Sequence, residues 1–368
     1  MAREATTTLR RGWTTGACAA AAAGAAYSAM LTGGFPDPAT LRLPRGSIAS
    51  FPLVLAEFNN GGARAGIRKD AGDDPDVTHG ALVVAEVSPE TPGSGIVFAA
   101  GEGVGTVSRP GLPLAVGEPA INPAPRAMIR ETLLNIAVAH GAAPLDVTVR
   151  ISIPGGERLA ERTMNARLGI IGGLSILGTS GIVIPYSCAS WIHSIHRGID
   201  VARAAGLGHI AAATGATSER AVQRLYSLPD HALIDMGDFV GATLKYLRRH
   251  PVARVTIAGG FAKLTKLAGG HLDLHSGKGG VDIPALATLL AELGADPQSL
   301  EGVRTARTAA EILAIADDKR EALVYRIAAG AREVALATLS GETAVEVAIT
   351  NRQGEFVARV GGWQPSDS

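Results

Sequence analysis

Apolar and polar positions alternate in short runs through the first half of the chain, beginning near residue 38. Runs with a period of two, separated by turns rich in Pro, Gly and Asn, predict β-strands. The pattern is clear in Asp146–Ile153, where Val147, Val149, Ile151 and Ile153 fall on one side. One helix is predicted at Arg126–His140. The other predicted strands are Thr40–Leu43, Phe51–Phe58, Ala63–Arg68, Ala81–Val87 and Ile96–Ala99.

The pattern changes near residue 180 to short apolar runs, each followed by a loop and then by a helical period. Alternating strands and helices predict a parallel sheet flanked by helices. The predicted strands are Ile182–Ile184, Ile210–Ala213, Leu233–Ile234 and Val255–Ala258, and a hairpin follows at Ala344–Ile349 and Phe356–Val360. The predicted helices are Ser218–Tyr226, Phe239–Arg249 and Ala262–Leu267, with others near 284–293, 307–316 and 321–339.

These patterns, with a length of 368 residues, predict two domains. Residues 1–165 are expected to form an α+β N-terminal domain with a mostly antiparallel sheet. Residues 180–368 are expected to form an α/β Rossmann-like C-terminal domain with a mainly parallel sheet. Between them, the joint at 166–179 alternates apolar residues with Gly and small hydroxyl residues. Such bare backbone passes close to another backbone or to a ligand, and a simple crossing between domains explains it nearly as well.

Charge and cysteine content narrow the class of protein. Lys plus Arg and Asp plus Glu both number 34, so the net charge is zero. This balance argues against nucleic acid as the main partner and against a strongly basic membrane surface. Cys18 and Cys188 have no C-x-x-C partner, so a zinc ribbon or a disulfide framework is not expected.

The N-terminus imitates an export signal, because Arg10 and Arg11 precede the alanine-rich run Ala17–Ala26. The run is weakly hydrophobic, however, and Thr14-Thr15-Gly16 can cap a helix that continues to about Leu31. We therefore predict a helix of the folded protein. No window approaches the roughly 20 continuous apolar residues of a membrane span.

The stretch from Lys69 to Gly80 places four aspartates and one histidine in twelve residues. Gly72 and Pro75 interrupt it, so we expect a loop. Four carboxylates on one short loop repel one another unless cations, hydrogen bonds or a ligand offset them. A solvated acidic turn and a functional loop both explain this composition.

Three predicted strands of the second half end in Thr214-Gly215, Asp235-Met236-Gly237-Asp238 and Gly259-Gly260. Ligands of open α/β sheets bind beyond the carboxyl ends of the strands, where glycine permits close approach and free helix N–H groups act as donors. A nucleoside-like cofactor and ordinary βα turns both fit these residues. A dinucleotide fits less well, because Gly101–Gly105 reads G-x-G-x-G and not G-x-G-x-x-G.

His271, Asp273 and His275 are residue types that bind zinc, and on a strand they would share one face. Glycines flank the triplet, and the sequence offers no His or Cys cluster elsewhere to complete a coordination shell. We therefore expect no protein-bound metal.

Several longer motifs follow one another along the chain: Leu9–Ala20, Lys69–Gly80, Gly101–Thr106, Gly117–Pro123, Asn165–Pro185, Thr214–Glu219, Met236–Gly241 and Lys263–Ala268. In this order they resemble the CbiD family, the cobalt-precorrin-5B C(1)-methyltransferases of cobalamin biosynthesis. The resemblance implies a cytoplasmic enzyme that transfers methyl from S-adenosyl-L-methionine to carbon 1 of the tetrapyrrole, giving cobalt-precorrin-6A. Cobalt would be present only within the substrate. Neighbouring pathway enzymes are conceivable partners, whereas nucleic acid and membrane are not.

With the resemblance, three groups of candidate site residues follow. The catalytic candidates, which would orient the ring or handle its proton, are Asp70, Asp73, Asp74, Asp76 and His79. The cofactor-binding candidates are Thr214, Gly215, Ser218, Glu219, Asp235, Gly237, Asp238, Gly259 and Gly260. The candidates for binding the substrate and its carboxylates are Arg10, Arg11, Thr14, Thr15, Lys69, Arg109 and Arg126.

Two alternatives stay open at this level. One is a methyltransferase that acts on a metal-free precorrin or at another position. The other is a non-catalytic tetrapyrrole-binding protein, which would need the anion-binding arginines but no S-adenosylmethionine site. An oxidoreductase is disfavoured by the missing dinucleotide fingerprint.

Overall fold

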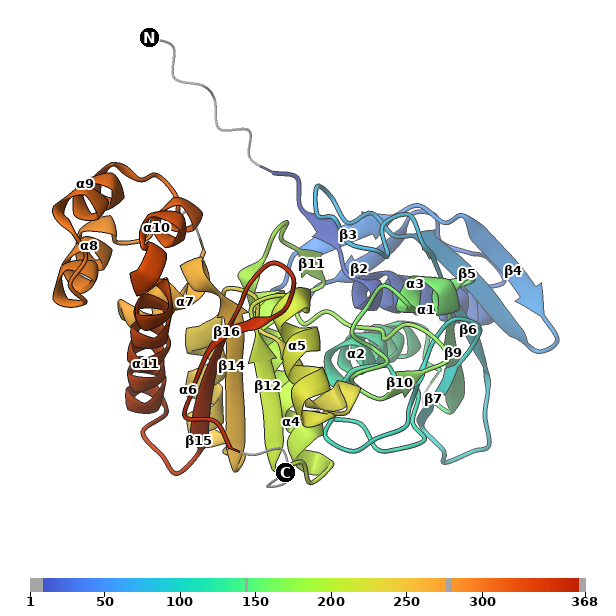
Figure 1. The fold of residues 1–368 in the computed structure, drawn as a ribbon. Helices are drawn as coiled ribbons and strands as arrows, with labels where there is room; N and C mark the ends of the chain where they lie inside the picture. Colours follow the sequence, from blue (N-terminus) through green and yellow to red (C-terminus); the bar gives the residue numbers. More distant parts are fainter. Residues whose placement is uncertain (1–8, 143–144, 276–279, 364–368) are drawn as a thin grey trace, which may run out of the picture. The chain divides into compact units, whose positions relative to one another are not determined.

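The computed structural model describes residues 9–142, 145–275 and 280–363. Contacts within the chain divide it into two compact units, Met1–Cys188 and Ala189–Ser368, so residues 166–179 belong to the first unit. The chain mixes helices with antiparallel and parallel sheets (Figure 1).

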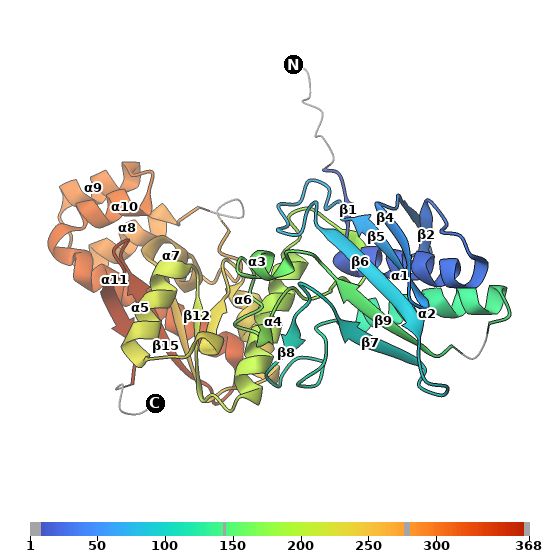
Figure 2. The same cartoon turned by 90° about the vertical axis from the view of Figure 1, so that its right-hand side faces the viewer.

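The first unit is built on a five-stranded sheet in the order β4-β5-β6-β9-β7. Neighbouring strands are antiparallel except for β7 and β9, which are parallel, so the predicted, mostly antiparallel sheet is confirmed. Helices α1 and α2 pack against each other, and α1 also packs against β5 and β6 (Figure 2). The bounds are α1 (Thr15–Thr32), α2 (Pro123–Ala139), β4 (Leu55–Asn59), β5 (Gly62–Arg68), β6 (Leu82–Pro89), β7 (Ile96–Ala100) and β9 (Val147–Ser152).

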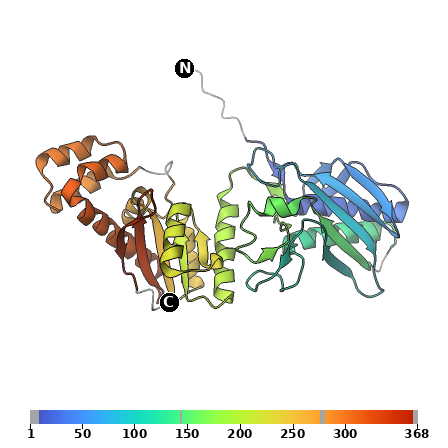
Figure 3. The ribbon, with the colours of Figure 1, turned by 45° about the vertical axis from the view of Figure 1, so that its right-hand side comes forward.

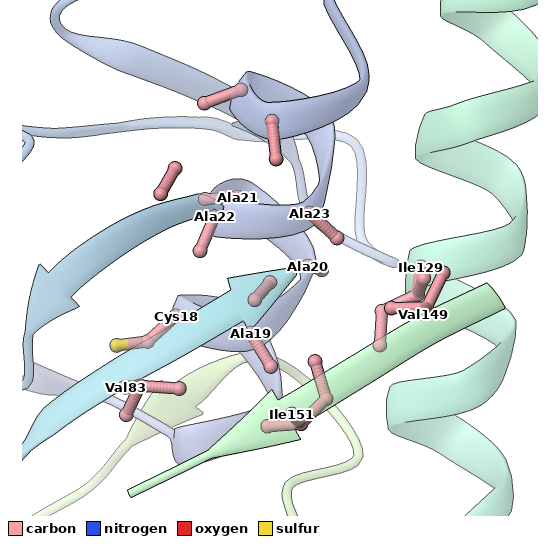
Figure 4. Packing of buried hydrophobic residues seen from close by; sticks show 14 of the residues in the cluster. Cys18, Ala19, Ala20, Ala21, Ala22, Ala23, Val83, Ile129, Val149 and Ile151 are labelled. Carbon is pink, nitrogen blue, oxygen red and sulfur yellow. The ribbon is translucent and has the colours of Figure 1, made fainter. Parts of the chain in front are cut away.

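Helix α1 begins where the sequence predicts, because the Thr14 hydroxyl caps it by accepting the Ala17 N–H at 3.1 Å. The alanine run is buried throughout, and its small side chains let the helix lie close to both α2 and the sheet (Figure 4). At Gly24 a Cβ atom would lie 2.7 Å from Cγ2 of Thr132 on α2. Within the described residues, no helix is both long and apolar enough to cross a membrane.

The first unit also contains three two-stranded pairs, of which β1 with β11 joins segments near its two ends. β1 (Gly12–Trp13) pairs with β11 (Ile182–Val183), and β8 (Thr106–Val107) pairs with β10 (Ile170–Ile171). The third pair is β2 (Ala39–Arg42) with β3 (Ile48–Phe51). The glycine-rich segment does pass close to other backbone, since the Gly16 N–H donates to the Leu177 carbonyl at 3.0 Å.

The second unit contains a five-stranded sheet in the order β13-β12-β14-β15-β16, parallel except at the edge strand β16. Alternate residues of β12 enter separate cores. Ala211 and Ala213 lie beside α5 (Ala216–Tyr226), and Ile210 and Ala212 lie beside α6 (Val240–Arg249), α7 (Phe261–Ala268) and α11 (Arg320–Leu339). Helices therefore cover both faces. The strands are β12 (His209–Ala213), β13 (Leu233–Asp235), β14 (Arg254–Gly260), β15 (Ala344–Thr350) and β16 (Phe356–Val360).

The helices of the second unit are α4 (Cys188–Ala204), α5 (Ala216–Tyr226), α6 (Val240–Arg249), α7 (Phe261–Ala268) and α11 (Arg320–Leu339). α8 (Ile283–Glu292), α9 (Pro297–Thr305) and α10 (Ala309–Ile315) form a small group, orange in Figure 3. Short 3₁₀ turns lie at η1 (Asp230–Ala232) and η3 (Asp317–Lys319).

Some elements differ from the sequence prediction. The predicted strand Phe51–Phe58 is wrong: β3 ends at Phe51 and β4 begins at Leu55, because Pro52 has no N–H to continue a ladder. Helices α3 (Gly156–Ala160), α4 and α9 were not predicted.

Candidate functional site

The acidic loop of the first unit packs against the N-terminal segment. The Trp13 N–H donates to the Asp70 carbonyl at 2.7 Å, and the Asp73 N–H donates to the Arg10 carbonyl at 3.0 Å. The segments lie so close that a Cβ atom on Gly72 would overlap the Arg10 carbonyl. Backbone contacts therefore fix this part of the loop.

Asp70 is paired with Arg10. The Arg10 guanidinium binds both oxygens of the carboxylate, with 2.9 Å between Nη2 and Oδ1, and the Gly72 N–H donates to Oδ1 at 2.9 Å. These bonds, that from Arg10 above all, lower the pKa of Asp70 to about 2. A carboxylate with so low a pKa is a poor proton acceptor near neutral pH. The two bonds to Asp70 instead fix the orientation of the Arg10 guanidinium.

Lys69 forms an ion pair with Asp76 inside the loop. Its side chain is buried, with 2 % of the residue exposed, and Nζ donates to Oδ2 of Asp76 at 2.7 Å. The other oxygen of Asp76 accepts the N–H and the hydroxyl of Thr78. Burial raises the pKa of Asp76, but Lys69 and Thr78 outweigh it, and the pKa lies below its usual value. Neither residue is presented freely to a ligand.

Asp73 and Asp74 each accept a backbone N–H with one oxygen. Oδ2 of Asp73 accepts from Arg10 at 2.6 Å, and Oδ1 of Asp74 accepts from Tyr186 at 2.8 Å. The two carboxylates thus attach the loop to segments that are remote in sequence, before and after it.

His79 is exposed, and its Nδ1 accepts the Ala71 N–H at 3.1 Å. Because Nδ1 accepts this hydrogen bond, the ring proton lies on Nε2. Nδ1 is also 3.9 Å from Oδ1 of Asp70. In this state His79 can donate a hydrogen bond from Nε2.

Part of the predicted substrate-binding set has local structural partners. Thr14 caps α1, and the Thr15 hydroxyl bonds to the backbone of Leu177. Arg126 donates to carbonyls at 119 and 121 and contacts the carboxylate of Glu118 at 3.3 Å. These bonds hold α2 to the turn before it.

The remaining arginines are accessible. Arg10 and Arg11 are exposed, and Arg109 is half-buried beside Gly169. Arg11 and Arg109 form no ion pair with any described residue. These three cations are therefore the members of the set that can receive an anion.

In the second unit, the predicted cofactor residues meet at the carboxyl edge of the sheet. Ala213 pairs in register with Asp235 and with Ala258, and the Thr214 N–H donates to the Ala258 carbonyl at 2.8 Å. In the sheet, β13 is the neighbour of β12 on one side and β14 is its neighbour on the other. β12 and β14 thus flank the topological switch point of the sheet.

Lys263, which the sequence prediction did not include, connects these strand ends. It lies on α7, directly after β14, and its Nζ donates to the Thr214 carbonyl at 2.9 Å. The same Nζ is 3.2 Å from Oδ1 of Asp238, in the loop after β13. Lys263 belongs to the motif Lys263–Ala268 found in the sequence, but the position of Lys263 beside Thr214 depends on the order of strands in the sheet.

Space is open at two of the predicted glycines. A Cβ atom on Gly215 or Gly260 would meet no atom within 4 Å, whereas on Gly259 it would lie 2.6 Å from Oγ1 of Thr214. Gly215 and Gly260 are the N-caps of α5 and α7, and neither helix start has a side-chain cap from a described residue. Free N–H groups at such ends attract anions.

The other candidates lie around this edge. The Ser218 hydroxyl donates to the carbonyl at the start of its helix, and Glu219 is buried in the first turn. The Asp235 carbonyl accepts Nε1–H of Trp191 at 3.0 Å. Gly237 has a φ of 51°, a conformation that favours glycine, beside the same indole.

Among the described residues, no group of three or more His, Cys, Asp and Glu side chains is placed to hold a metal ion. In the His271–His275 segment, the His275 N–H donates to the Asp273 carboxylate at 3.1 Å.

The family model for CbiD matches residues 2–185, and that for the CbiD C-terminal domain matches 273–361. A protein of Bradyrhizobium sp. (strain BTAi1 / ATCC BAA-1182) is 59% identical over 352 residues, 95% of this chain and 93% of that protein. The chain belongs to the CbiD family. The resemblance found in the sequence motifs is thereby confirmed.

The similar proteins of the CbiD family share a name. The Bradyrhizobium protein is called cobalt-precorrin-5B C(1)-methyltransferase. So is a Brucella anthropi protein, 56% identical over 96% of both chains. A crystal structure of the cobalamin biosynthesis protein CbiD from Archaeoglobus fulgidus is 30% identical and covers 71% of this chain and 80% of its own, with a TM-score of 0.40.

Proposed function

We propose that this chain is a cobalt-precorrin-5B C(1)-methyltransferase, which forms cobalt-precorrin-6A in cobalamin biosynthesis. The observation that carries the proposal is 55–59% identity to relatives of that name over nearly the full length of both chains. The relatives' name implies a methyl donor, and S-adenosyl-L-methionine is the donor proposed here. A cytoplasmic location belongs to the same proposal, because S-adenosylmethionine is made and used there.

The carboxyl edge of the second unit's sheet suits S-adenosylmethionine. The strand order, with β13 and β14 on opposite sides of β12, supports the proposal of a doubly wound, Rossmann-like sheet, in which ligands bind at the switch point. Open space at Gly215 and Gly260 and the free N–H groups of two helix starts suit the carboxylate of the methionine part. The carboxylates of Asp235 and Asp238 suit ribose hydroxyls or the ammonium group.

S-adenosylmethionine, when bound, supplies a methyl group already activated on a sulfonium. The protein then has to align the reactants, exclude water and accept a proton from the ring. Lys263 is proposed to position the site, because it bonds to both the Thr214 carbonyl and the Asp238 carboxylate at the carboxyl edge of the sheet.

The first unit is proposed to bind the tetrapyrrole, whose acetate and propionate groups need cations. Arg10, Arg11 and Arg109 are the accessible ones, and Asp70 holds Arg10 in place. Asp73 commits one oxygen to the Arg10 N–H, which leaves its second oxygen as the proposed proton acceptor.

Labelled methyl transfer tests the function. The purified protein, incubated with methyl-labelled S-adenosylmethionine and cobalt-precorrin-5B, should yield a tetrapyrrole one labelled methyl heavier by mass spectrometry. Faster turnover of the metal-free precorrin would reassign the substrate. Tight tetrapyrrole binding without methyl transfer would favour a carrier.

A matched pair of variants tests the cofactor edge. Asp235→Asn should weaken S-adenosylmethionine binding by roughly 1–3 kcal/mol if a charge-assisted hydrogen bond is lost. Asp230→Asn changes the same residue type at the opposite end of β13, in η1, and should leave affinity unchanged. Isothermal titration calorimetry measures both. Equal affinities for the two variants and the wild type would remove Asp235 from the site.

A further inference from the structure

Tyr186 has an unusual backbone for an aromatic residue. Its φ is 56°, in the left-handed region where a side chain crowds the backbone. The other described non-glycine residues with positive φ are Ser227, Asp317 and Ser340, which have small or polar side chains, and both serines cap helix ends. Tyr186 instead follows Pro185 in the turn after β11.

The position of Tyr186 is held by the acidic loop. Oδ1 of Asp74 accepts the Tyr186 N–H at 2.8 Å, across 112 residues of sequence. The acidic loop is itself bonded to the Arg10 backbone. Strand β1, which follows Arg10 in the chain, pairs with β11, which precedes Tyr186. Strained residues persist only where their surroundings fix them, and they cluster at functional sites.

The ring itself is left uncovered. Tyr186 is 68% exposed, and the described residues include no ring-stacking partner or side-chain hydrogen bond for it. The strained backbone is thus held by Asp74, while the described residues leave the ring uncovered. The ring is therefore placed where a bound ligand can pack against it.

The surroundings indicate the chemistry of that ligand. Ile184 and Leu9 are exposed apolar side chains on the same two strand-paired segments, and Arg10 and Arg11 are exposed cations beside them. An aromatic ring, apolar side chains and guanidinium groups complement a flat macrocycle with apolar faces and a carboxylate rim.

We propose that Tyr186 is a substrate-binding residue whose ring packs against a face of the tetrapyrrole, and that Asp74 positions it. This inference rests on the proposed function of the chain. It assigns Asp74 the role of a positioning residue, which acts through the Tyr186 N–H.

The test combines stability with binding. Tyr186→Gly relieves the backbone strain and removes the ring. It should raise the melting temperature of the first unit by about 2–4 °C and weaken tetrapyrrole binding about tenfold. Tyr186→Phe keeps the ring and should bind within about twofold of wild type. Tyr325→Ala, which removes another exposed tyrosine, on α11, should not change tetrapyrrole affinity. Binding is read from the absorption spectrum of the tetrapyrrole titrated with protein, so no turnover is needed.

The role of Asp74 is tested in the same assay. Asp74→Ala loses the acceptor and should weaken tetrapyrrole binding severalfold, whereas Asp74→Asn keeps an acceptor oxygen and should bind like wild type. In the Tyr186→Gly background, Asp74→Ala should have little further effect. A full additional loss there would show that Asp74 does not act through Tyr186.

The outcomes separate this inference from the proposed function. If wild type binds and methylates the tetrapyrrole but Tyr186→Gly binds it equally well, the inference is wrong and the function stands. If wild type binds without methylating, the function fails and the binding series alone decides about Tyr186. If wild type does not bind the tetrapyrrole, both are overturned.

Discussion

His209, at the amino end of β12, is 6% exposed and belongs to a buried polar cluster. Its Nε2 lies 2.9 Å from the Thr256 hydroxyl, which donates to Glu346 at 2.8 Å. Because Thr256 gives its proton to Glu346, His209 must donate from Nε2, and Nδ1 has no proton and no partner among the described residues. Burial, and then the charge of Arg254, lower the His209 pKa to about 4.

This pKa predicts a loss of stability in mild acid. The unfolded chain takes up the His209 proton near pH 6.5, whereas the folded protein does so only near pH 4. The stabilisation is therefore complete above pH 6.5 and is lost as the pH falls toward 4. Between pH 7 and 5, His209 should account for roughly 1–2 kcal/mol of the free energy of unfolding.

Urea unfolding of wild type and His209→Gln at both pH values measures this term. Other histidines, such as His193 and His196, also have lowered pKa values, so only the difference between the two proteins reports on His209. Equal pH dependence in the two proteins would contradict the assignment.

Residue types in the acidic loop were predictable, but their partners were not. The sequence indicates that four carboxylates need cations or N–H donors. It does not reveal that Arg10 serves Asp70 from 60 residues away, or Tyr186 serves Asp74 from 112. Such pairs depend on the tertiary fold. Lys263 was missed for the same reason, because its contacts require the order of strands in the sheet.

At the scale of elements, two helical glycines differ in the space available for a side chain. A Cβ atom on Gly24 of α1 would lie 2.7 Å from Thr132, whereas on Gly330 of α11 it would lie 3.4 Å from Cβ of Ala268, near the lower limit of ordinary contact. Replacing glycine by alanine in a helix normally stabilises it by roughly 0.5–1 kcal/mol. We expect that gain for Gly330→Ala, but a net loss of about 1–3 kcal/mol for Gly24→Ala because α1 and α2 must separate. Chemical denaturation of the two variants measures the signs, and a stabilised Gly24→Ala would show that the helix contact is loose.

Element predictions succeeded where a pattern is local and strong. The capped alanine helix, the alternating strand β9 and the βα rhythm of the second unit all appear in the structure. Helix α4 was overlooked although Ile195, Ile199 and Ala202 follow a helical spacing and are buried. Helix α9 has only Val303 buried among its described residues and offers little pattern to detect. Sheet order is non-local and could not be derived from the sequence.

At the scale of the whole molecule, the chain has separate hydrophobic cores. One is built from α1, α2 and the sheet of the first unit, and others lie on the two faces of the sheet in the second unit. The accessible cations and the acidic loop belong to the first unit, and the open glycines with Lys263 belong to the second. The proposed division of labour, substrate on one unit and cofactor on the other, therefore has a thermodynamic consequence.

Differential scanning calorimetry of the full-length protein should resolve two transitions, because each unit has its own core. S-adenosylmethionine at about 100 times its dissociation constant adds about 2.7 kcal/mol to the unit that binds it, which shifts one transition upward by roughly 5–10 °C. His209→Gln should change the pH dependence of this same transition, and Gly24→Ala should lower the other. If the cofactor instead raises the transition that Gly24→Ala lowers, its site lies in the first unit, and the assignment of the strand ends is wrong.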